Sequence, residues 1–435
     1  MHYFSTLIKL LILLLIAGQG HTLFSQVKTL SNDGAWCWFS GPSAIYMHNN
    51  ADEIITGWVT SDGSIETAIL NLKTEEKNFQ NVSPQLEIDD HDNPSFTELN
   101  NGEILMSYTK HSDNVVRIHH MNPEDKRFGP MQGVNVNNEA MLKLYPRKGV
   151  TYANPIQLTE ENNRLFIFGR WTGFKPNMMW GNDFGRSFED AKVFITNYPF
   201  KAGNRPYVRY YSDGKSKIHI VFTDGHPRNE PVNSVYYACY EKGAFWKVDG
   251  TKICDLTEIP FEPKDATIVY KAAEELGRAW VYDIAADKEG QPVILYARYP
   301  TEQDHIYHYT RYDGKRWTDY KICHSGKWFP QTQEGKHERE PHYSAGMTIH
   351  PLKTNAIYLS REINGVFEIE KRLTKDNGKT WEITAITRNS KYDNVRPVFP
   401  RNMQPGDIPV LLWMKNEKYI HYTNYKTAIN YFIDN

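Results

Sequence analysis

The sequence predicts an all-β fold and, within that class, a seven-bladed β-propeller. Short runs rich in β-branched and aromatic residues recur along the chain between turns of Gly, Asn, Asp and Pro. No amphipathic helical pattern extends beyond a few turns, and no low-complexity linker interrupts the series. Hairpins ending in an aromatic residue suit blades of roughly 55 to 60 residues, which gives about seven blades after a leader is removed. Six blades is the nearest alternative.

The β-type runs are spread over the whole chain, so we expect residues 27–435 to form a single domain. Aromatic residues make up 13% of the sequence, which is enough for both a large core and aromatic-lined grooves. The clearest runs are 53–59, 164–168, 217–222, 293–296, 356–359 and 410–414.

One hairpin carries a recognisable local repeat. Residues 374–381 fit the Asp-box pattern, Ser/Thr-x-Asp-x-Gly-x-Thr-Trp, which caps a hairpin between the outer strands of a propeller blade. Residues 181–188 are a weaker copy, and residues 242–246 and 312–317 are degenerate hairpins that end in an aromatic. The Asp and Gly serve the turn geometry while the aromatic fills the space between sheets, so we assign these boxes a structural role and no chemistry.

The first 26 residues predict a signal peptide rather than part of the fold. Lys9 precedes the apolar run 10–17, and small or polar residues follow as far as Gln26. The run is short for a bilayer span, so an uncleaved membrane anchor is the weaker alternative. We therefore expect a secreted or periplasmic protein.

The charge balance argues against some partners. The chain has 50 Lys plus Arg against 52 Asp plus Glu. Nothing in this balance indicates a nucleic acid or a membrane surface as a bulk electrostatic partner. We expect a monomer that binds neither nucleic acid nor a membrane.

Four cysteines are too few for a disulfide scaffold in an exported protein of this size. Cys239 and Cys254 end two strand-like runs joined by a Gly-containing turn, so we expect them to oppose each other across a hairpin. His226 is a nearby candidate for a third ligand, which would make a structural zinc site. A disulfide, a zinc site and plain buried thiols are the three alternatives.

Two histidines are candidates for proton transfer. His91 precedes an Asn-Pro turn and His111 ends the next strand-like run, so both can face one cavity near neutral pH. The alternative is that His91 only hydrogen-bonds the turn and His111 is a solvated strand end.

Two further residues suit an acidic substrate. Arg170 ends an apolar strand, where a guanidinium can hold a carboxylate with two hydrogen bonds; a salt bridge at a blade end is the alternative. Tyr152 precedes a second Asn-Pro turn, and we expect a nearby cation to lower the pKa of its phenol enough for proton exchange. Its alternative role is that of a core or groove aromatic.

Six segments in order carry a family resemblance. They are residues 34–39, 90–95, 152–155, 168–171, 223–228 and 342–346. Together they resemble the BNR-repeat propeller proteins that include the ulvan lyases, most closely polysaccharide lyase family 25, with family 24 as its relative.

The resemblance implies a seven-bladed propeller that cleaves ulvan, a sulfated polysaccharide of rhamnose 3-sulfate and uronate, by β-elimination and without a cofactor. It implies that His91 and Tyr152 form the base and acid pair, that Arg170 neutralises the uronate carboxylate, and that His111 is a second active-site histidine. The substrate-binding residues that we expect from it are Asn93, Asn154, Tyr207 and Tyr210.

Two other classes of function stay open. A glycoside hydrolase needs a pair of carboxylates about 5 to 10 Å apart, and candidates are Asp89, Asp90, Asp92 and Asp224. Related propellers include rhamnosidases with an active site on a different face. The non-enzymatic alternative is a carbohydrate-binding propeller without catalysis.

Overall fold

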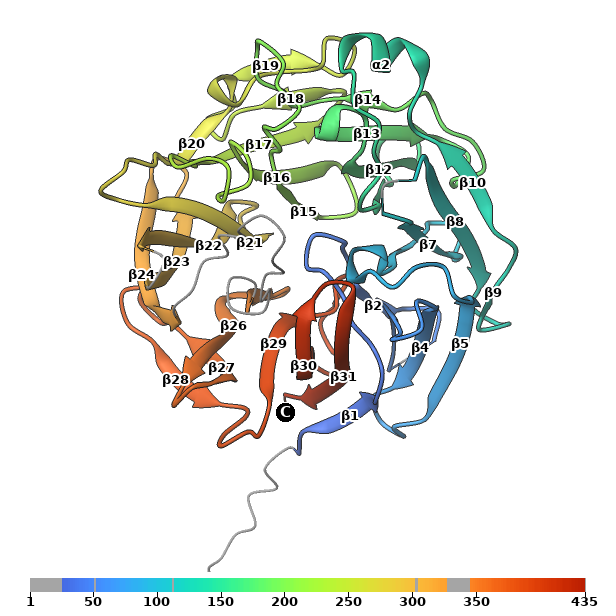
Figure 1. Ribbon diagram of the computed structural model, residues 1–435, viewed down its shortest axis with the longest axis vertical. Helices are drawn as coiled ribbons and strands as arrows, with labels where there is room; N and C mark the ends of the chain where they lie inside the picture. The colour runs from blue at the N-terminus through green and yellow to red at the C-terminus, as the bar shows by residue number, and fades with distance from the viewer. Residues whose placement is uncertain (1–25, 51, 112, 302–303, 327–344, 435) are drawn as a thin grey trace, which may run out of the picture.

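The computed structural model describes residues 26–50, 52–111, 113–301, 304–326 and 345–434. Within these ranges seven antiparallel sheets surround a central channel, which confirms the predicted seven-bladed β-propeller (Figure 1). Residues 1–25 of the predicted signal peptide and residues 342–344 of the last resemblance segment lie outside the described residues. No helix in the described part of the chain is long and apolar enough to cross a membrane.

The first three complete sheets follow one another along the chain. The first contains β2 (Ala44–Met47), β3 (Glu53–Val59), β4 (Ile65–Asn71) and β5 (Lys77–Ser83). The second contains β6 (Ser95–Glu98), β7 (Ile104–Thr109), β8 (Val115–Asn122) and β10 (Gln132–Asn135), with β9 (Arg127–Phe128) beside β8. The third contains β11 (Asn154–Leu158), β12 (Arg164–Arg170), β13 (Pro176–Gly181) and β14 (Lys192–Val193).

The fourth sheet is the largest and contains β15 (Val208–Ser212), β16 (Lys217–Thr223), β17 (Val235–Glu241), β18 (Ala244–Trp246) and β19 (Lys252–Asp255), with β20 (Thr267–Tyr270) paired to β17. The fifth contains β21 (Arg278–Ala286), β22 (Pro292–Thr301), β23 (Asp304–Tyr312) and β24 (Trp317–Gly326). The sixth contains β25 (Met347–His350), β26 (Lys353–Ile363), β27 (Val366–Leu373) and β28 (Glu382–Ala385).

The seventh sheet joins the two ends of the described chain. It contains β29 (Asp393–Val398), β30 (Val410–His421), β31 (Asn424–Ile433) and, as its outer strand, β1 (Lys28–Ser31). Thr29 lies opposite Asn430 in the register, and its hydroxyl donates to the side-chain oxygen of Asn430 at 3.0 Å. This closure supports the single domain that the sequence predicts for residues 27–435, which stays a prediction.

The helical segments are short and lie in connections. They are α2 (Glu139–Leu144) and the 3-10 turns η1 (Asp90–Asp92), η2 (Thr172–Phe174) and η3 (Pro263–Asp265). Two of them lie near the innermost strands: η1 leads into the innermost strand β6, and η2 follows β12, which pairs with the innermost strand β11.

The first strand of each complete sheet lies innermost, beside the channel (Figure 1). These strands begin at one end of the channel, which we call the first mouth, where His91, Tyr152 and Tyr207 precede β6, β11 and β15. They end at the opposite end, the second mouth, where His48 follows β2 and Leu99 follows β6. The two mouths therefore collect residues from different ends of the same strands.

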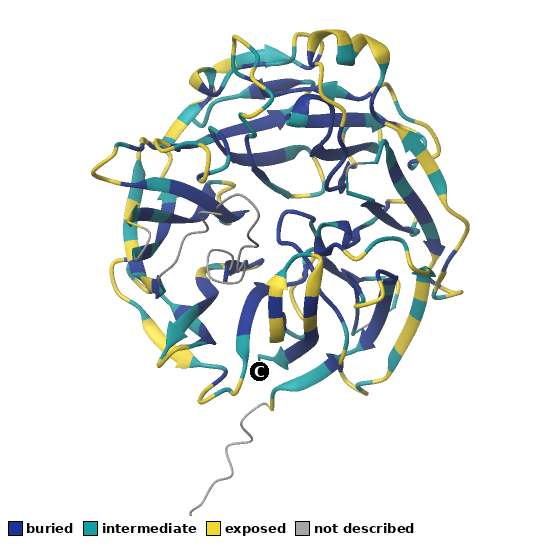
Figure 2. Ribbon diagram, in the orientation of Figure 1, coloured by how far each residue is buried: buried dark blue, intermediate teal, exposed yellow. Residues whose placement is uncertain are grey.

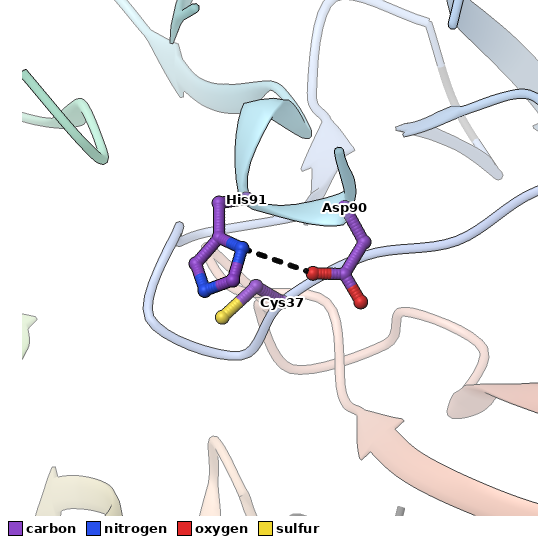
Figure 3. A group of neighbouring side chains, drawn as sticks. All are labelled: Cys37, Asp90 and His91. Atoms are coloured by element: carbon purple, nitrogen blue, oxygen red, sulfur yellow. Dashed lines mark ion pairs between the residues drawn. The ribbon is translucent and has the colours of Figure 1, made fainter. Parts of the chain in front are cut away.

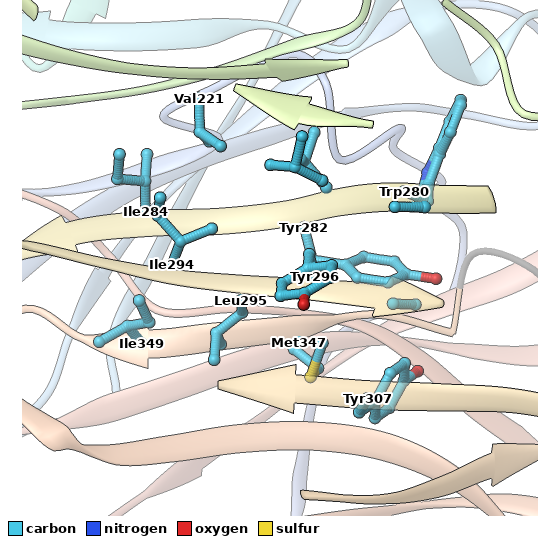
Figure 4. Close-up of a cluster of buried hydrophobic side chains, with 14 of the residues drawn as sticks. Val221, Trp280, Tyr282, Ile284, Ile294, Leu295, Tyr296, Tyr307, Met347 and Ile349 are labelled. Atoms are coloured by element: carbon cyan, nitrogen blue, oxygen red, sulfur yellow. The ribbon is translucent and has the colours of Figure 1, made fainter. Parts of the chain in front are cut away.

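The core lies between neighbouring sheets, and exposed residues gather at the outer strands and loops (Figure 2). The largest apolar cluster joins the fourth, fifth and sixth sheets, where Trp280, Tyr282 and Ile284 of β21 pack near Met347 and Ile349 of β25 (Figure 4). Side chains that alternate along an inner strand point to both neighbouring sheets, and in β21 this alternation is shifted between Val281 and Asp283.

One buried carboxylate connects four sheets near the channel. Asp283 of β21 is 1% exposed and accepts hydrogen bonds from the Thr348 hydroxyl at 3.0 Å and the Ile349 amide at 2.9 Å, both in β25. Its other partners are the guanidinium groups of Arg401, which follows β29, and of Arg209 in β15 at 3.7 Å. The sheets therefore share a buried network of opposite charges.

The Asp box has the structural role that we assigned to it. The Asp376 carboxylate accepts hydrogen bonds from the amide of Thr380 at 2.8 Å and from its hydroxyl at 2.7 Å. Trp381 then packs its ring 5.3 Å from that of Tyr309 in the fifth sheet. In the weaker copy, Asp183 holds the turn by accepting from the amide of Ser187 at 2.9 Å.

We expect the protein to lose stability between about pH 6.5 and pH 4, because buried histidines are kept neutral. Burial lowers the pKa of His219 to about 3 and that of His350 to about 4. Both folded pKa values lie below the ordinary value of about 6.5, so the unfolded chain takes up protons first as the pH falls. Stability is complete above the unfolded pKa and falls by up to about 1.4 kcal/mol per pH unit for each histidine.

Urea unfolding at a series of pH values measures this loss. His219→Gln, which removes one titrating ring, should give a shallower dependence on pH than the wild-type protein. The Asp89 carboxylate does not contribute in this window, because its stabilisation is lost only below its ordinary pKa of about 3.9. An unfolding midpoint that stays constant down to about pH 4 would contradict the prediction.

Candidate active site

The first mouth brings together five of the residues that the sequence singled out. The rings of His91 and His111 lie 5.0 Å apart, and that of His91 lies 5.8 Å from the ring of Tyr152. Tyr152 in turn lies 6.5 Å from Tyr207, and the Arg170 guanidinium lies 5.2 Å from the centre of the Tyr152 ring. They meet because each residue immediately precedes an inner strand or ends the strand beside it.

A buried aspartate holds both histidines. One oxygen of Asp89 lies 2.7 Å from Nδ1 of His91, and its other oxygen lies 2.6 Å from Nδ1 of His111. Burial opposes the ionisation of Asp89, but the two imidazoles hold its pKa well below the ordinary value. With the carboxylate on Nδ1, the proton of each neutral ring stays on that atom, which makes Nε2 the basic nitrogen.

Tyr152 is a buried phenol in a strained backbone position. Its φ of 67° lies in the left-handed region, and its carbonyl accepts a hydrogen bond from the Trp171 indole at 3.0 Å. Its hydroxyl lies 3.9 Å from the sulfur of Cys37. A functional site is one place where a non-glycine residue is kept in such a conformation.

The expected effect of the nearby cation on Tyr152 is wrong. Burial raises the pKa of the phenol well above its usual value, and the Arg170 guanidinium does not offset this effect. The desolvation of a phenolate dominates because the side chain is almost fully enclosed. Tyr152 is therefore protonated at neutral pH, which suits a proton donor rather than a base.

Arg170 ends β12 with its backbone paired to Thr151, to whose carbonyl its amide donates at 2.8 Å. The residue is 7% exposed, and its guanidinium donates to the hydroxyl of Tyr207. Among the described residues no carboxylate lies within ion-pair distance of Arg170, and its buried Nε has no hydrogen-bond partner. Within that part of the chain, the salt bridge considered as its alternative role is absent.

The side chains of the two asparagines at this mouth form hydrogen bonds within the protein. The Asn93 side-chain oxygen accepts from the Cys37 amide at 3.0 Å, and that of Asn154 accepts from the Gly41 amide at 2.6 Å. Their exposures are 1% and 3%. Both amides therefore position the loop that runs from Cys37 to Gly41 rather than present their polar atoms to the channel.

The sequence did not distinguish Tyr207 from Tyr210, but the structure separates them. Tyr207 contacts Arg170 through its hydroxyl and lies 4.8 Å from the ring of Trp280. Tyr210 instead stacks on Phe168, with ring centres 4.6 Å apart, and packs against the cluster of the third and fourth sheets. Tyr207 is thus the better candidate for contact with a ligand at the first mouth.

Behind the histidines lies a second buried group, shown in Figure 3. Asp90 Oδ1 lies 3.3 Å from Nδ1 of His91, and Asp90 also forms a buried ion pair with Arg396. Burial, followed by the charge of Asp90, raises the pKa of the Cys37 thiol to about 12. The thiol is therefore neutral, and this group contacts both His91, through Asp90, and the Tyr152 hydroxyl, through Cys37.

Two groups among the described residues have the composition of metal ligands, and both include His91. They are Cys37, Asp90 and His91, and Asp89, His91 and His111, with ligand atoms within 4.8 Å of one another in each group. In the second group Asp89 already pairs with both histidines, and in the first Asp90 pairs with His91.

His226, Cys239 and Cys254, from which we expected a zinc site, do not form a ligand group among the described residues, and no disulfide joins the two cysteines. Cys239 lies in β17 and Cys254 in β19, so β18 separates them instead of a hairpin turn. Cys239 belongs to the cluster of the fifth sheet, whereas Cys254 packs against that of the third. His226 follows β16 at the first mouth, while Cys239 lies four residues into β17, about 13 Å along the strand.

A larger cavity of about 710 Å³ opens at the second mouth, compared with about 20 Å³ beside Tyr152 and Arg170. His48 and Glu98 line it, and Nδ1 of His48 lies 2.9 Å from the Glu98 carboxylate. Nε2 of His48 lies 3.4 Å from Asp407. The hydrogen bond with Glu98 raises the pKa of His48 despite partial burial. Sequence reasoning missed these residues because they come from separate sheets and form no local motif.

Comparison with known proteins identifies relatives by sequence family and by fold. Residues 54–325 match the model of a family described as BNR repeat-containing family member. No curated protein matches the sequence.

Several solved structures share the fold. One is an ulvan lyase of polysaccharide lyase family PL25 bound to -[GlcA(1-4)Rha3S]-, with a TM-score of 0.66 and 14% identity over 93% of this chain and 94% of that chain. The polysaccharide lyase Uly1 has a TM-score of 0.55 and 11% identity over 94% and 97% of the two chains. The BP39L lectin of Burkholderia pseudomallei has a TM-score of 0.52 and 9% identity over 93% and 97%. At these identities the similarity shows the propeller fold, which lyases and a lectin share.

Proposed function

The chain belongs to the BNR repeat-containing family, and from this premise we propose that its first mouth cleaves a uronate-containing polysaccharide by β-elimination. The observation that carries the proposal is the buried guanidinium of Arg170, which has no carboxylate partner among the described residues and lies against the protonated phenol of Tyr152. A buried cation without a counter-charge is a ready site for the carboxylate of a ligand.

Elimination makes three demands on the site, and the first mouth holds a group for each. The C5 proton of a uronate is weakly acidic, so Arg170 would neutralise the carboxylate beside it. His91, with Nδ1 on Asp89, would take the C5 proton at Nε2. As the C4=C5 double bond forms and the C4–O4 bond breaks, Tyr152 would give its proton to O4. His111 is hydrogen-bonded to the same Asp89 carboxylate and would stabilise the ion pair that Asp89 forms with protonated His91.

We propose ulvan as the substrate. The resemblance of the ordered motifs and the fold shared with the PL25 ulvan lyase and Uly1 support this choice. The leader that the sequence predicts would deliver the protein to a polysaccharide outside the cytoplasm, so we also propose a secreted or periplasmic enzyme.

The purified protein is expected to convert ulvan into products that carry an unsaturated uronate, detected by ultraviolet absorbance. Arg170→Met should lower kcat by about 10²- to 10³-fold, because it removes the charge that stabilises the transition state. Arg316→Met is the matched control, since Arg316 is 81% exposed on the turn between β23 and β24. A protein that leaves ulvan intact would contradict the proposal.

A second candidate function is glycoside hydrolysis at the second mouth. The favouring observation is the cavity of about 710 Å³ in which His48 is held by Glu98 and carries a raised pKa. In this alternative a protonated His48 would serve as the general acid. Cleavage without an unsaturated product, lost in His48→Gln and retained in Tyr152→Phe, would favour hydrolysis over elimination.

A further inference from the structure

Three arginines surround one phenylalanine at the first mouth. The guanidinium carbons of Arg147, Arg205 and Arg170 lie 4.6 Å, 5.0 Å and 6.0 Å from the centre of the Phe174 ring. Arg147 lies in the connection before β11, Arg205 in that before β15, and Phe174 in η2. Two connections and the end of β12 therefore bring positive charge to the same ring.

The position of Phe174 is fixed by its own loop. Its φ of 53° follows that of Gly173 at 74°, so two successive residues have left-handed backbone. The ring also packs directly on the backbone of Gly149, where an added Cβ would lie 2.3 Å from a ring carbon. Only glycine at position 149 permits this contact, and the ring is therefore held rigidly between the arginines.

The connection that contains Arg205 is also held by hydrogen bonds from Lys175. The buried amine of Lys175 donates to the carbonyl of Lys201 at 2.8 Å and to the side-chain oxygen of Asn204 at 3.1 Å. Among the described residues the buried Nε of Arg205 has no polar partner, and the guanidinium is held by its contact with Phe174.

No described carboxylate lies within ion-pair distance of Arg147, Arg170 or Arg205. The pKa of Arg205 is lowered by burial and by the neighbouring guanidinium groups of Arg170 and Arg147. Burial and the arginines nearby likewise lower the pKa of His226 well below its usual value. Such a group of like charges is unfavourable in the free protein and becomes favourable when an anion binds.

We propose that Arg147 and Arg205, which both contact the Phe174 ring, form a second anion subsite that binds the sulfate ester of the sugar next to the uronate held by Arg170. This inference rests on the proposed function, because it assigns the two anionic groups of one polysaccharide to neighbouring arginines. A planar guanidinium donates two parallel hydrogen bonds to a tetrahedral oxyanion, and the Phe174 ring offers an apolar surface between the two. The subsite would therefore make binding depend on a sulfate group at a fixed distance from C5 of the uronate.

The test is a comparison of ulvan with chemically desulfated ulvan. For each of Arg205→Met and Arg147→Met we expect KM for ulvan to rise about tenfold, as for loss of one charge-assisted contact, while kcat changes little. With desulfated ulvan, the KM of the wild-type protein should rise to about the value that the variants show with ulvan. Neither substitution should raise the KM for desulfated ulvan further. Arg205→Lys should recover part of the lost affinity, since lysine restores the positive charge but not the two parallel hydrogen bonds of a guanidinium. Arg316→Met is the control for loss of one positive charge.

Calorimetric binding of both polysaccharides to the wild-type protein and the variants separates this inference from the proposed reaction. Sulfate-dependent binding that weakens in Arg205→Met supports the subsite even if no unsaturated product forms, in which case only the elimination fails. Equal binding of both polysaccharides by the wild-type protein overturns the subsite. Losses in the variants that are as large on desulfated ulvan as on ulvan also overturn it, because the anion would then be a carboxylate.

Discussion

Tyr152→Phe is expected to lower the turnover of ulvan by about 10²- to 10⁴-fold, the usual contribution of a general acid or base. The substitution removes one hydroxyl and keeps the ring that packs near Phe39 and Tyr207. The raised pKa makes Tyr152 a proton donor at neutral pH, so its loss leaves O4 to depart without a proton. The measurement is kcat from the formation of the unsaturated uronate, with circular dichroism to show that the fold is retained.

Tyr210→Phe is the matched control, since Tyr210 is a nearby, partly buried tyrosine whose ring stacks on Phe168. It should retain kcat within about twofold. If Tyr152→Phe also retained wild-type turnover, the phenol would be a groove aromatic, and another group would have to protonate the leaving oxygen.

Asp283→Ala is expected to lower the free energy of unfolding by about 3 to 5 kcal/mol, the usual cost of removing one partner of a buried ion pair. The change leaves the mostly buried guanidinium groups of Arg209 and Arg401 without their shared carboxylate. It also removes the acceptor for the Thr348 hydroxyl and the Ile349 amide. Four sheets lose a common contact at once.

Urea unfolding of Asp283→Ala and of a control variant measures this loss of stability. Asp255→Ala is the control, because its pair with Lys252 is 45% exposed on both sides and exposed pairs contribute about 0 to 1 kcal/mol. Equal midpoints for Asp283→Ala and Asp255→Ala would show that the buried network does not stabilise the ring.

The fold was predictable because its signals are local and repeated. Each hairpin carries its own turn residues, and the Asp box at residues 374–381 specifies a turn and the aromatic residue that packs between the fifth and sixth sheets. A pattern of this kind survives in sequence because the same geometry is needed in every blade. The exact register of strands was not predictable, since it depends on pairing between distant segments.

The sequence predicted which residues meet at the candidate site, but not the protonation state of Tyr152. His91, Tyr152 and Arg170 stand at strand ends that meet at one mouth, so their order in the sequence was informative. The sign of the shift in the pKa of Tyr152 was not predictable, because it depends on how completely the folded protein encloses the phenol.

Residues that act through distant partners were also missed or misplaced. The bridge that Asp89 makes between two histidines depends on the path of η1 and of the end of β7. Cys239 and Cys254 seemed adjacent because β18 is only three residues long, but the extra strand places them on opposite faces of the sheet.

The pairing of β1 with β31 has a consequence for the order of folding. Lys28 and Tyr431 become neighbours only after nearly the whole chain has been synthesised. Until then the segment that becomes β1 is an unpaired edge, and the seventh sheet lacks its outer strand. The entropy of joining such distant segments grows only slowly with their separation, but the search for them is slow. The ring therefore cannot close until the segment around Tyr431 has been synthesised and is free to pair with β1.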